Sequence, residues 1–286
     1  MKRGWITWDK TELPPSAFES RLAVVRARLA AADLPALVVY SDVWRSNQGR
    51  YLSNFMPYWN RALLVIPRDG APVLLCGLSP RVYPWIRSVT ILEDIRPSAN
   101  IPQQLNQLRT EKGWSRIGVL DLPQLPYELS VPDAVDVPWS AIHAEPDEAE
   151  LSMYRRAAAM AREILDEELS GPPVLLDRRF VGRLERRFRR AGAEDLVIFI
   201  TGDSVSVALE YRGHWVKIVR ATVAAPRSSS VFKTELLSGP YPYECCLQSD
   251  LKPGSIFAVT TEGIVEGKRV FHGDTFRLGP DGAELL

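Results

Sequence analysis

Two histidines stand near carboxylic acids on segments that alternate like β-strands, and either could act as a general base. His214 follows Glu210, and His272 follows Glu262. A histidine titrates near neutral pH, and a catalytic base needs a fixed partner and a tuned pKa. These four residues are therefore the candidate catalytic set. A hydrogen-bonded strand histidine without a catalytic role is the alternative for both, and His143 is expected to be solvated.

A second group of residues with binding chemistry lies in a polar stretch between two predicted strands. Its aromatic and arginine side chains are Trp44, Arg45, Arg50, Tyr51, Phe55 and Trp59. Exposed aromatic and arginine residues are typical of interface anchors. The group either contacts a substrate or a partner subunit, or packs within its own domain, and the sequence leaves both interpretations open.

Arginines are also concentrated in one predicted helix, with seven between Arg178 and Arg190. They could form a surface for an acidic partner, or the solvated side of a helix that Asp177 and Glu185 partly neutralise. The whole chain carries 35 Lys+Arg and 35 Asp+Glu, so its net charge is zero. Binding of a polyanion through bulk charge is therefore not expected, although a local basic patch stays open, and a nucleic-acid partner is not expected.

Several motifs that would indicate a cofactor or a membrane are absent from the sequence. There is no glycine-rich phosphate loop, no dinucleotide fingerprint and no cysteine spacing suited to zinc. The N-terminus lacks the apolar core of a signal peptide, and every apolar run is too short to cross a bilayer. We expect no cofactor, no membrane span and a cytoplasmic location.

The first half of the chain alternates helical and strand patterns, which indicates an α/β layer domain. Apolar residues at helical spacing predict a helix over 16–32, and further helices are predicted near 80–87 and 101–112. Short apolar runs predict these strands: 36–40, 62–66, 72–76 and 116–120. Pro67-Arg68-Asp69-Gly70 predicts a hairpin turn, because Asp-Gly supplies the positive φ that tight turns need.

The second half predicts two helices followed by strands, which indicates an α+β domain. The first helix carries an apolar stripe from Leu151 to Leu169, with acids crowded at its start. The second covers about 177–190, with Gly192 just past its end. The strands that follow are predicted at 196–200, 205–211, 215–223, 256–260 and 270–278.

The order of these parts resembles the creatinase/aminopeptidase P (prolidase-like) family. In the first half the matching pieces are the loop Tyr51-Leu52-Ser53-Asn54-Phe55 and the strand Leu63–Pro67. In the second half they are Tyr211-Arg212-Gly213-His214-Trp215, Leu251–Phe257 and Gly273-Asp274-Thr275. The resemblance implies a creatinase-like α/β N-terminal domain over 1–143. It also implies a degenerate, shortened pita-bread α+β C-terminal domain over 144–286.

The sequence departs from this family where the family holds two metal ions with two Asp, one His and two Glu. Lys217 stands at one Asp position, the other Asp position falls near Ser206, and the two Glu positions fall near Thr261 and Gly273. The segment from 227 to 251 contains no histidine. We therefore expect no metal. A shifted alignment would offer other carboxylates, namely Asp203, Glu210, Glu262 and Asp274.

The resemblance and these departures lead to three functional hypotheses. The first is a non-catalytic pseudo-peptidase subunit, which forms a homodimer or a heterodimer with an intact pita-bread homologue. It would support C–N bond hydrolysis by lending residues 44–55 to the partner's active site. The second is a metal-independent hydrolase of a small C–N substrate, like creatinase, using His214 or His272. The third is a module that binds an acidic partner. Arg220 joins the candidates for substrate or partner contact.

Overall fold

The computed structural model describes residues 7–57, 60–170, 175–223, 228–237, 244–245 and 251–286. The chain divides into two compact units, of which the first ends at Ala144 and the second begins at Glu145. Each buried hydrophobic cluster draws its residues from a single unit. None of the described helices is long and apolar enough to cross a membrane.

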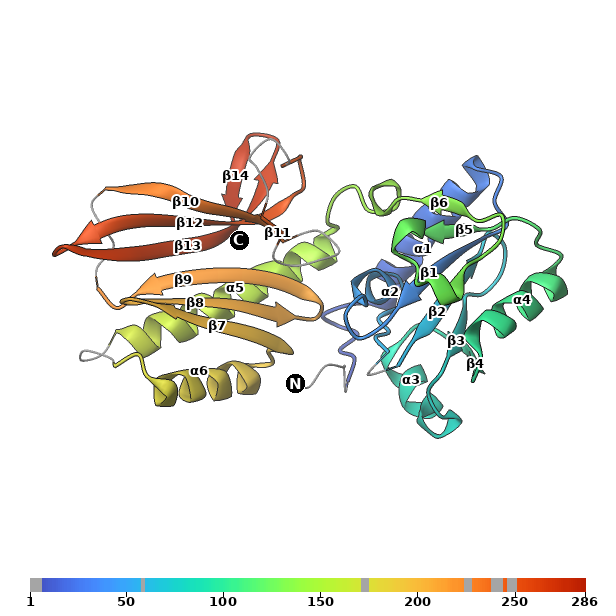
Figure 1. The fold of residues 1–286 in the computed structure, drawn as a ribbon, viewed down its shortest axis with the longest axis horizontal. Coiled ribbons are helices and arrows are strands. Elements are labelled where there is room, and N and C mark those ends of the chain that lie inside the picture. Colours follow the sequence, from blue (N-terminus) through green and yellow to red (C-terminus); the bar gives the residue numbers. More distant parts are fainter. Residues whose placement is uncertain (1–6, 58–59, 171–174, 224–227, 238–243, 246–250) are drawn as a thin grey trace. The chain divides into compact units, whose positions relative to one another are not determined.

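The first unit is built on a six-stranded mixed sheet in the order β4-β3-β2-β1-β5-β6 (Figure 1). Its strands are β1 (Ala36–Ser41), β2 (Ala62–Pro67), β3 (Val73–Cys76), β4 (Asp94–Pro97), β5 (Gly118–Leu120) and β6 (Val135–Val137). Strands β2 and β3 form the predicted antiparallel hairpin, and Gly70 adopts a φ of 110° in its turn. Strands β4 and β6 were not predicted, because runs of four and three residues are too short to show a periodic pattern.

Helices cover both faces of this sheet, as expected for an α/β layer domain. α1 (Pro15–Ala31), α2 (Asn47–Ser53) and α3 (Tyr83–Val89) share a core with one face. α4 (Ile101–Lys112) and the 3₁₀ turn Tyr127–Leu129 share a core with the other. The remaining 3₁₀ turns are Pro80–Val82, Leu122–Gln124 and Trp139–Ala141.

The second unit opens with the two predicted helices, and local sequence explains where each begins. α5 (Glu148–Leu169) starts with a capping box, in which Asp147 accepts from the Glu150 N–H while Glu150 accepts from the Asp147 N–H. α6 (Arg178–Ala191) is capped by the Asp177 side chain and ends at Gly192, which has a φ of 108°.

An eight-stranded sheet completes the second unit, in the order β11-β10-β12-β13-β9-β8-β7 with β14 beside β13. The strands are β7 (Asp195–Thr201), β8 (Ser204–Tyr211), β9 (His214–Ala221), β10 (Ser229–Leu236), β11 (Glu244–Cys245), β12 (Ile256–Val265), β13 (Lys268–Gly279) and β14 (Gly282–Leu285). Every pairing is antiparallel. The two helices are followed by strands, as expected for an α+β domain. The strands β10, β11 and β14 were not predicted, because β10 is mostly polar and the other two are short.

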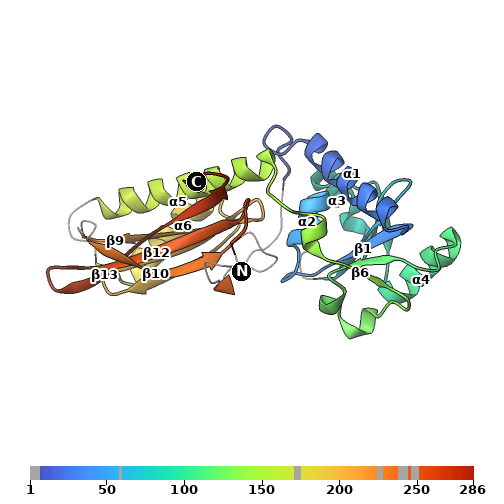
Figure 2. The ribbon, with the colours of Figure 1, turned by 90° about the horizontal axis from the view of Figure 1, so that it is seen from above.

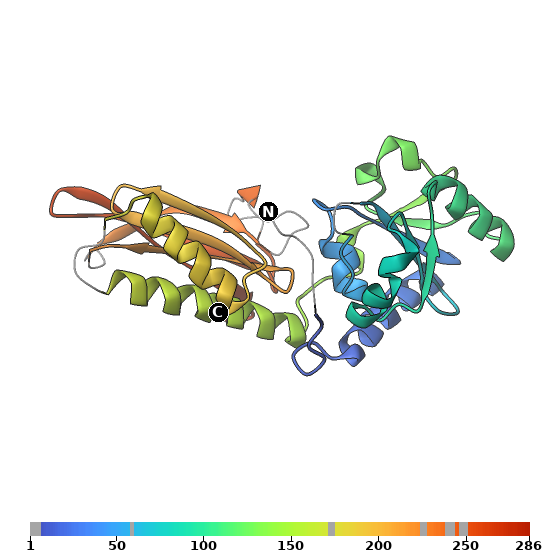
Figure 3. The same cartoon turned by 90° about the horizontal axis from the view of Figure 1, so that it is seen from below.

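The two faces of this sheet have different environments. α5 and α6 cover one face, and the described residues place no helix on the other (Figures 2 and 3). Strand alternation sends Val207 and Ile218 into the core beneath the helices, while Ser206 and Lys217 point to the open face. Residues directed to the open face are therefore the ones available to a ligand.

Candidate functional site

A hollow of about 710 Å³ lies on the open face of the second unit's sheet. Its volume falls within the range of roughly 300–1,000 Å³ typical of small-molecule sites. Apolar, aromatic and charged side chains of several strands line it: Val197, Phe199, Thr201, Ser204, Ser206, Ala208, Lys217, Val219, Phe232, Lys233, Glu235, Thr260, Arg269 and Phe271. We call this hollow the sheet pocket.

The charged centre of the sheet pocket is a carboxylate held between two ammonium groups. Lys217 on β9 pairs with Oε2 of Glu235 on β10, and the Nζ of Lys233 lies 2.7 Å from Oε1 of the same residue. The strands β12 and β13 separate β9 from β10 in the sheet. The small residue Ala258 occupies the register position between Glu235 and Thr275, so the two long side chains can meet across these strands.

A hydroxyl group fixes the backbone from which Lys217 projects. The Lys217 N–H donates to Thr275 Oγ1 at 2.8 Å, and the Thr275 hydroxyl donates to the Lys217 carbonyl at 2.9 Å. Thr275 is fully buried, so both hydrogen bonds are shielded from water. The position of Lys217 is therefore set by the interior of the sheet.

The ion pairs determine the protonation state of Glu235, which is only 3% exposed. Burial by itself would raise the pKa of this carboxyl group, but hydrogen bonds from Lys217 and Lys233 outweigh it and hold the pKa below its usual value. Glu235 is therefore ionised at neutral pH, and each of its two oxygens already accepts from an ammonium group.

A second ion pair lies beside the aromatic part of the sheet pocket. Arg269 donates to Glu262 Oε2 through Nε at 2.9 Å and also through a terminal nitrogen. Its guanidinium carbon lies 5.3 Å from the ring centroid of Phe232 and 5.2 Å from that of Phe271. Glu262 is thus engaged by an arginine on the neighbouring strand, and the arginine is held over two aromatic rings.

The residues at the expected metal positions do not fit a metal pair. Ser206 and Lys217 both line the sheet pocket, where the cation of Lys217 repels a metal ion. Gly273 lacks a side chain, and a Cβ there would lie 2.8 Å from the Val259 carbonyl oxygen. Thr261 donates its hydroxyl to the His272 carbonyl. The described part of the chain contains no group of three or more His, Cys, Asp or Glu that could hold a metal.

The carboxylates that a shifted alignment would supply are scattered rather than clustered. Asp203 pairs with Lys268, Asp274 pairs with Arg220, and Glu262 pairs with Arg269. Glu210 is buried and does not line the sheet pocket.

His214 lies on the helix-covered face, away from the sheet pocket. Its ring contacts Tyr154 of α5 edge-on with centroids 4.8 Å apart, and its Nε2 lies 3.7 Å from Glu150 Oε1, beyond hydrogen-bond distance. Its Nδ1 is buried without a hydrogen-bond partner among the described residues. Glu210 points to the opposite face, because the odd-numbered residues of β8 face the helices. The structure therefore does not bring His214 and Glu210 together.

His272 likewise does not meet Glu262, because register places Glu262 opposite Phe271 and His272 opposite Thr261. Burial lowers the pKa of His272, and the nearby charge of Arg220 lowers it further. Arg220 donates to both oxygens of Asp274 and to Asp166 of α5. Arg220 is therefore part of an ion-pair network between β9, β13 and α5, and it does not line the sheet pocket.

The aromatic and arginine group of the first unit is largely internal. Phe55 and Arg50 are buried, and Tyr51 packs edge-on against Trp139 with centroids 5.2 Å apart. Packing within the domain therefore explains these three residues. Arg45 is held by Asp42 at 2.7 Å and by the Gln124 carbonyl at 2.7 Å.

Trp44 differs from its neighbours because it is 67% exposed. It is the one member of this group, among those described, whose side chain lies mainly in solvent. Trp59 lies outside the described residues.

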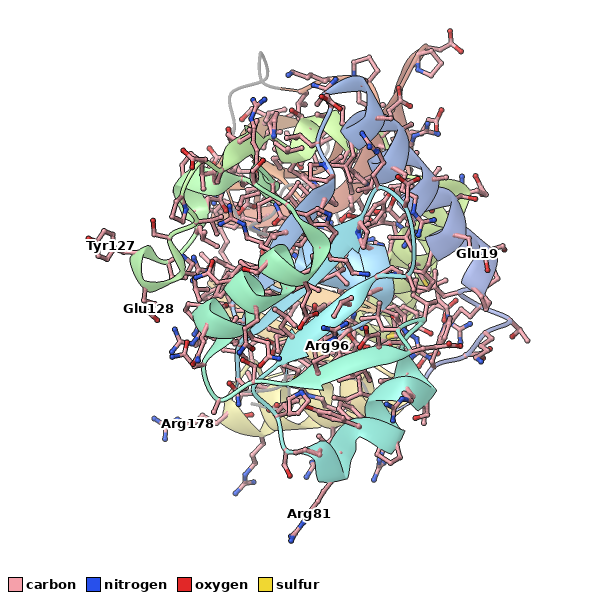
Figure 4. All side chains as sticks on the ribbon, turned by 90° about the vertical axis from the view of Figure 1, so that its right-hand side faces the viewer. Glu19, Arg81, Arg96, Tyr127, Glu128 and Arg178 are labelled. Atoms are coloured by element: carbon pink, nitrogen blue, oxygen red, sulfur yellow. The ribbon has the colours of Figure 1, made fainter. Side chains whose placement is uncertain are left out.

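The arginine-rich helix α6 is partly engaged by α5. Arg183 and Arg187 hold Glu168 at 2.7 and 3.0 Å. Burial alone would raise the pKa of Glu168, but these hydrogen bonds lower it. Arg178, at the first position of α6, projects away from the protein (Figure 4). Arg183 and Arg187 thus form ion pairs between the two helices. The charge of these two arginines is accounted for without an acidic partner molecule.

Sequence reasoning considered Ser206 and Lys217 and missed the other pocket residues, among them Phe232, Lys233 and Glu235. These three lie on β10, which was not predicted. The available signal was the spacing of Lys233 and Glu235, because residues two apart in a strand share one face.

Comparison with solved structures places this geometry in a known fold. The X-Pro aminopeptidase from Thermotoga maritima MSB8 superposes with a TM-score of 0.68 at 12% identity, covering 91% of this chain and 97% of that one. The prolidase from Pyrococcus horikoshii OT3 gives 0.67 at 12% identity, with 93% and 97% covered. The Xaa-Pro dipeptidase from Bacillus anthracis gives 0.66 at 15% identity, with 94% and 97% covered.

These similarities confirm, at the level of the fold, the resemblance to the creatinase/aminopeptidase P group. The fold is pita-bread-like, and identities this low show the fold alone. By sequence, no family model and no curated protein matches the chain.

Proposed function

We propose that this chain is a non-catalytic, metal-independent relative of the pita-bread peptidases. In this proposal its C-terminal domain is a degenerate and shortened pita-bread domain. One observation carries the proposal. The residue at an expected metal-ligand position, Lys217, is a cation already paired with the buried Glu235. Its ammonium brings positive charge to a place where a metal site needs negative charge.

The physical basis is the charge balance of a binuclear site. Two divalent cations are held together only when bridging carboxylates offset their repulsion. In the sheet pocket both oxygens of Glu235 already accept from lysines. A metal pair would have to displace two ammonium groups, and neither the hydroxyl of Ser206 nor Gly273, which has no side chain, offers a replacement carboxylate.

The proposal includes assembly as a homodimer or as a heterodimer with an intact pita-bread homologue, in the cytoplasm. The exposed Trp44 supports a contact from the first unit. Arg50 and Phe55 are buried inside the first unit and are not accessible to a partner subunit. The proposed contact with the partner is therefore smaller than the whole of residues 44–55.

The two alternatives have less support. A creatinase-like hydrolase would need His214 or His272 in a pocket beside an acid, and both lie away from the sheet pocket. Binding of an acidic partner would use α6, of which Arg183 and Arg187 are already paired with Glu168.

Metal binding and turnover test the proposal directly. The purified protein is incubated with manganese, cobalt or zinc, desalted and analysed for metal, and then assayed on Xaa-Pro dipeptides beside an active prolidase. We expect less than one tightly bound metal ion per chain and no turnover above the buffer. Two metal ions per chain, with hydrolysis that Glu262→Gln abolishes, would overturn the proposal.

Assembly is tested separately by affinity capture at native expression levels, followed by mass spectrometry and by light scattering of the purified protein. Recovery of a pita-bread homologue supports the heterodimer, and a self-associated pair supports the homodimer. A monomer that captures no homologue would remove the subunit role.

A further inference from the structure

Another hollow lies in the first unit, where the neighbouring parallel strands β3 and β4 end. Its volume is about 430 Å³, within the range of small-molecule sites. In α/β sheets, ligands commonly bind outside the carboxyl ends of the strands. The residues that line it include Arg61 before β2, Ser98 after β4, Ile101 at the start of α4, and Glu128. We call this hollow the α4 pocket.

The α4 pocket contains a buried hydroxyl group. Ser98 is only 6% exposed, and its Oγ has no hydrogen-bond partner among the described residues. The Ser98 N–H donates to the Cys76 carbonyl at 3.0 Å, which fixes the backbone. Ile95 packs into the core on the opposite face of the sheet, so alternation along the chain directs Ser98 to the face that carries α4. A buried hydroxyl without a partner costs stability, and a ligand that accepts from it removes this cost.

The start of α4 adds a second donor. α4 has 12 residues, and the aligned peptide dipoles of a helix give its N-terminus a partial positive charge. Its first turn carries no acidic side chain, and its cap is the neutral Asn100, which accepts from the Gln103 N–H at 3.1 Å. Pro102 has no N–H, so the Ile101 N–H is the donor that neither the helix nor its cap uses within the described residues. A helix start of this kind attracts an anion.

An arginine supplies a full positive charge at the same pocket. The Arg61 N–H donates to Asn60 Oδ1 at 2.8 Å, so the backbone that carries this side chain is held. The Arg61 guanidinium pairs with Glu128 through one nitrogen, and the two side chains are 48% and 63% exposed. An exposed ion pair contributes little net stability. An anion in the pocket can therefore replace Glu128 at the guanidinium.

We propose that the α4 pocket binds a phosphate group, which accepts from the Ser98 hydroxyl, the Arg61 guanidinium and the Ile101 N–H. These donors come from three different parts of the first unit. A phosphate has three acceptor oxygens and can serve all of them, whereas a carboxylate has two oxygens in one plane. Arginine and a helix N-terminus are also the donors that phosphate sites commonly use. This site lies in the first unit and is independent of the proposed absence of metal from the second.

The test measures binding of inorganic phosphate to the full-length protein by phosphorus NMR, with sodium chloride added to keep the ionic strength constant. We expect saturable binding of a single phosphate per chain at millimolar concentration. Acetate in the same concentration range should not displace it. The absence of saturable phosphate binding, or equally tight binding of acetate, would overturn the inference.

Free phosphate and a small phosphate monoester present the same group, and two probes distinguish them. Tighter binding of glycerol phosphate than of inorganic phosphate assigns the pocket to phosphate esters, and the reverse order assigns it to free phosphate. Neither measurement depends on the metal and turnover assays. A failure here leaves the non-catalytic proposal standing, and metal-dependent turnover would remove that proposal without affecting phosphate binding.

Variants locate the site. Ser98→Ala and Arg61→Met should each weaken phosphate binding by about ten-fold, because each removes a hydrogen bond to a charged group. Glu128→Gln should instead tighten binding by about two- to five-fold, because the carboxylate that competes for Arg61 is lost. The matched controls are Arg81→Met and Glu111→Gln, at exposed positions of the first unit that do not line the α4 pocket. Unchanged affinity in all three pocket variants, or an equal loss in the controls, would overturn the inference.

The stability of Ser98→Ala separates a binding role from a structural one. Without phosphate, its free energy of unfolding should equal or exceed that of the native protein, because a buried hydroxyl without a partner is removed. With phosphate, the native protein should gain more stability than the variant. A clear loss of stability without phosphate, with phosphate binding unchanged, would show a structural role for Ser98 and overturn its assignment. Should Ser98→Ala not fold, Arg61→Met carries the test, because Arg61 lies at the surface.

Discussion

At the scale of single residues, Glu235 holds the sheet pocket together. Its buried carboxylate separates two ammonium groups that would otherwise repel each other. A buried ion pair is a weak source of net stability, but removing one partner leaves the other charge buried and uncompensated. The free energy of unfolding should therefore respond strongly to loss of this carboxylate.

We expect Glu235→Gln to lower the free energy of unfolding at neutral pH by on the order of 3 kcal/mol. The pKa of Glu235 is lowered in the folded state. Its contribution is thus fully present above the ordinary carboxyl pKa of about 4.3. That contribution is lost as the pH falls below this value and through the folded pKa. Urea unfolding of both proteins at a series of pH values measures the difference.

Glu185→Gln is the matched control. Glu185 is half-exposed on α6 and lies 3.8 Å from Arg189, so its loss should change stability by less than about 0.5 kcal/mol. A difference between Glu235→Gln and the native protein that stays constant from neutral to strongly acidic pH would contradict ionisation of Glu235 in the fold.

At the scale of elements, α5 packs on the centre of the second sheet, and its apolar stripe forms much of the core with β8 and β9. The stripe includes Leu151, Ala158 and Leu165, spaced so that they share one face of the helix. The capping box at Asp147 determines where this helix begins.

We expect Asp147→Ala to lower the free energy of unfolding by about 1 kcal/mol, since the Glu150 N–H loses its acceptor at the helix start. Chemical denaturation monitored by circular dichroism provides the measurement. Glu163→Ala, at an exposed position in the middle of α5, should change stability by less than about 0.5 kcal/mol. Similar losses for the two variants would show that the cap contributes little to the stability of this unit.

At the scale of the whole molecule, two separate cores predict two independently folding units. The first unit buries two clusters on the two faces of its sheet, and the second buries one cluster between its helices and its sheet. A unit that has its own hydrophobic core can fold alone.

We expect the fragments 1–144 and 145–286, expressed separately, each to unfold cooperatively with heat and to give dispersed amide signals in NMR spectra. Cooperative unfolding requires a specific packed core, which each unit has. The full-length protein measured in parallel is the control. A fragment that binds a hydrophobic dye and unfolds without a cooperative transition would show that its core depends on the other unit.

The amino-acid sequence by itself determined the local elements and the residue types at the expected metal positions. Helices α5 and α6 could be predicted because their apolar spacing, the caps Asp147 and Asp177, and Gly192 all act within a few residues. Lys217 could be read directly at an expected ligand position. These are local properties, so one stretch of chain is enough to reveal them.

Only the tertiary structure decided which side chains meet. Lys217 and Glu235 are brought together by the order β10-β12-β13-β9, which depends on strand pairings along the whole second unit. The same register sent His214 and His272 to the helix-covered face, away from Glu210 and Glu262. A shift of one residue reverses the face of every side chain in a strand. Composition and spacing therefore identified candidate residues. The long-range pairing of strands determined which side chains line the sheet pocket.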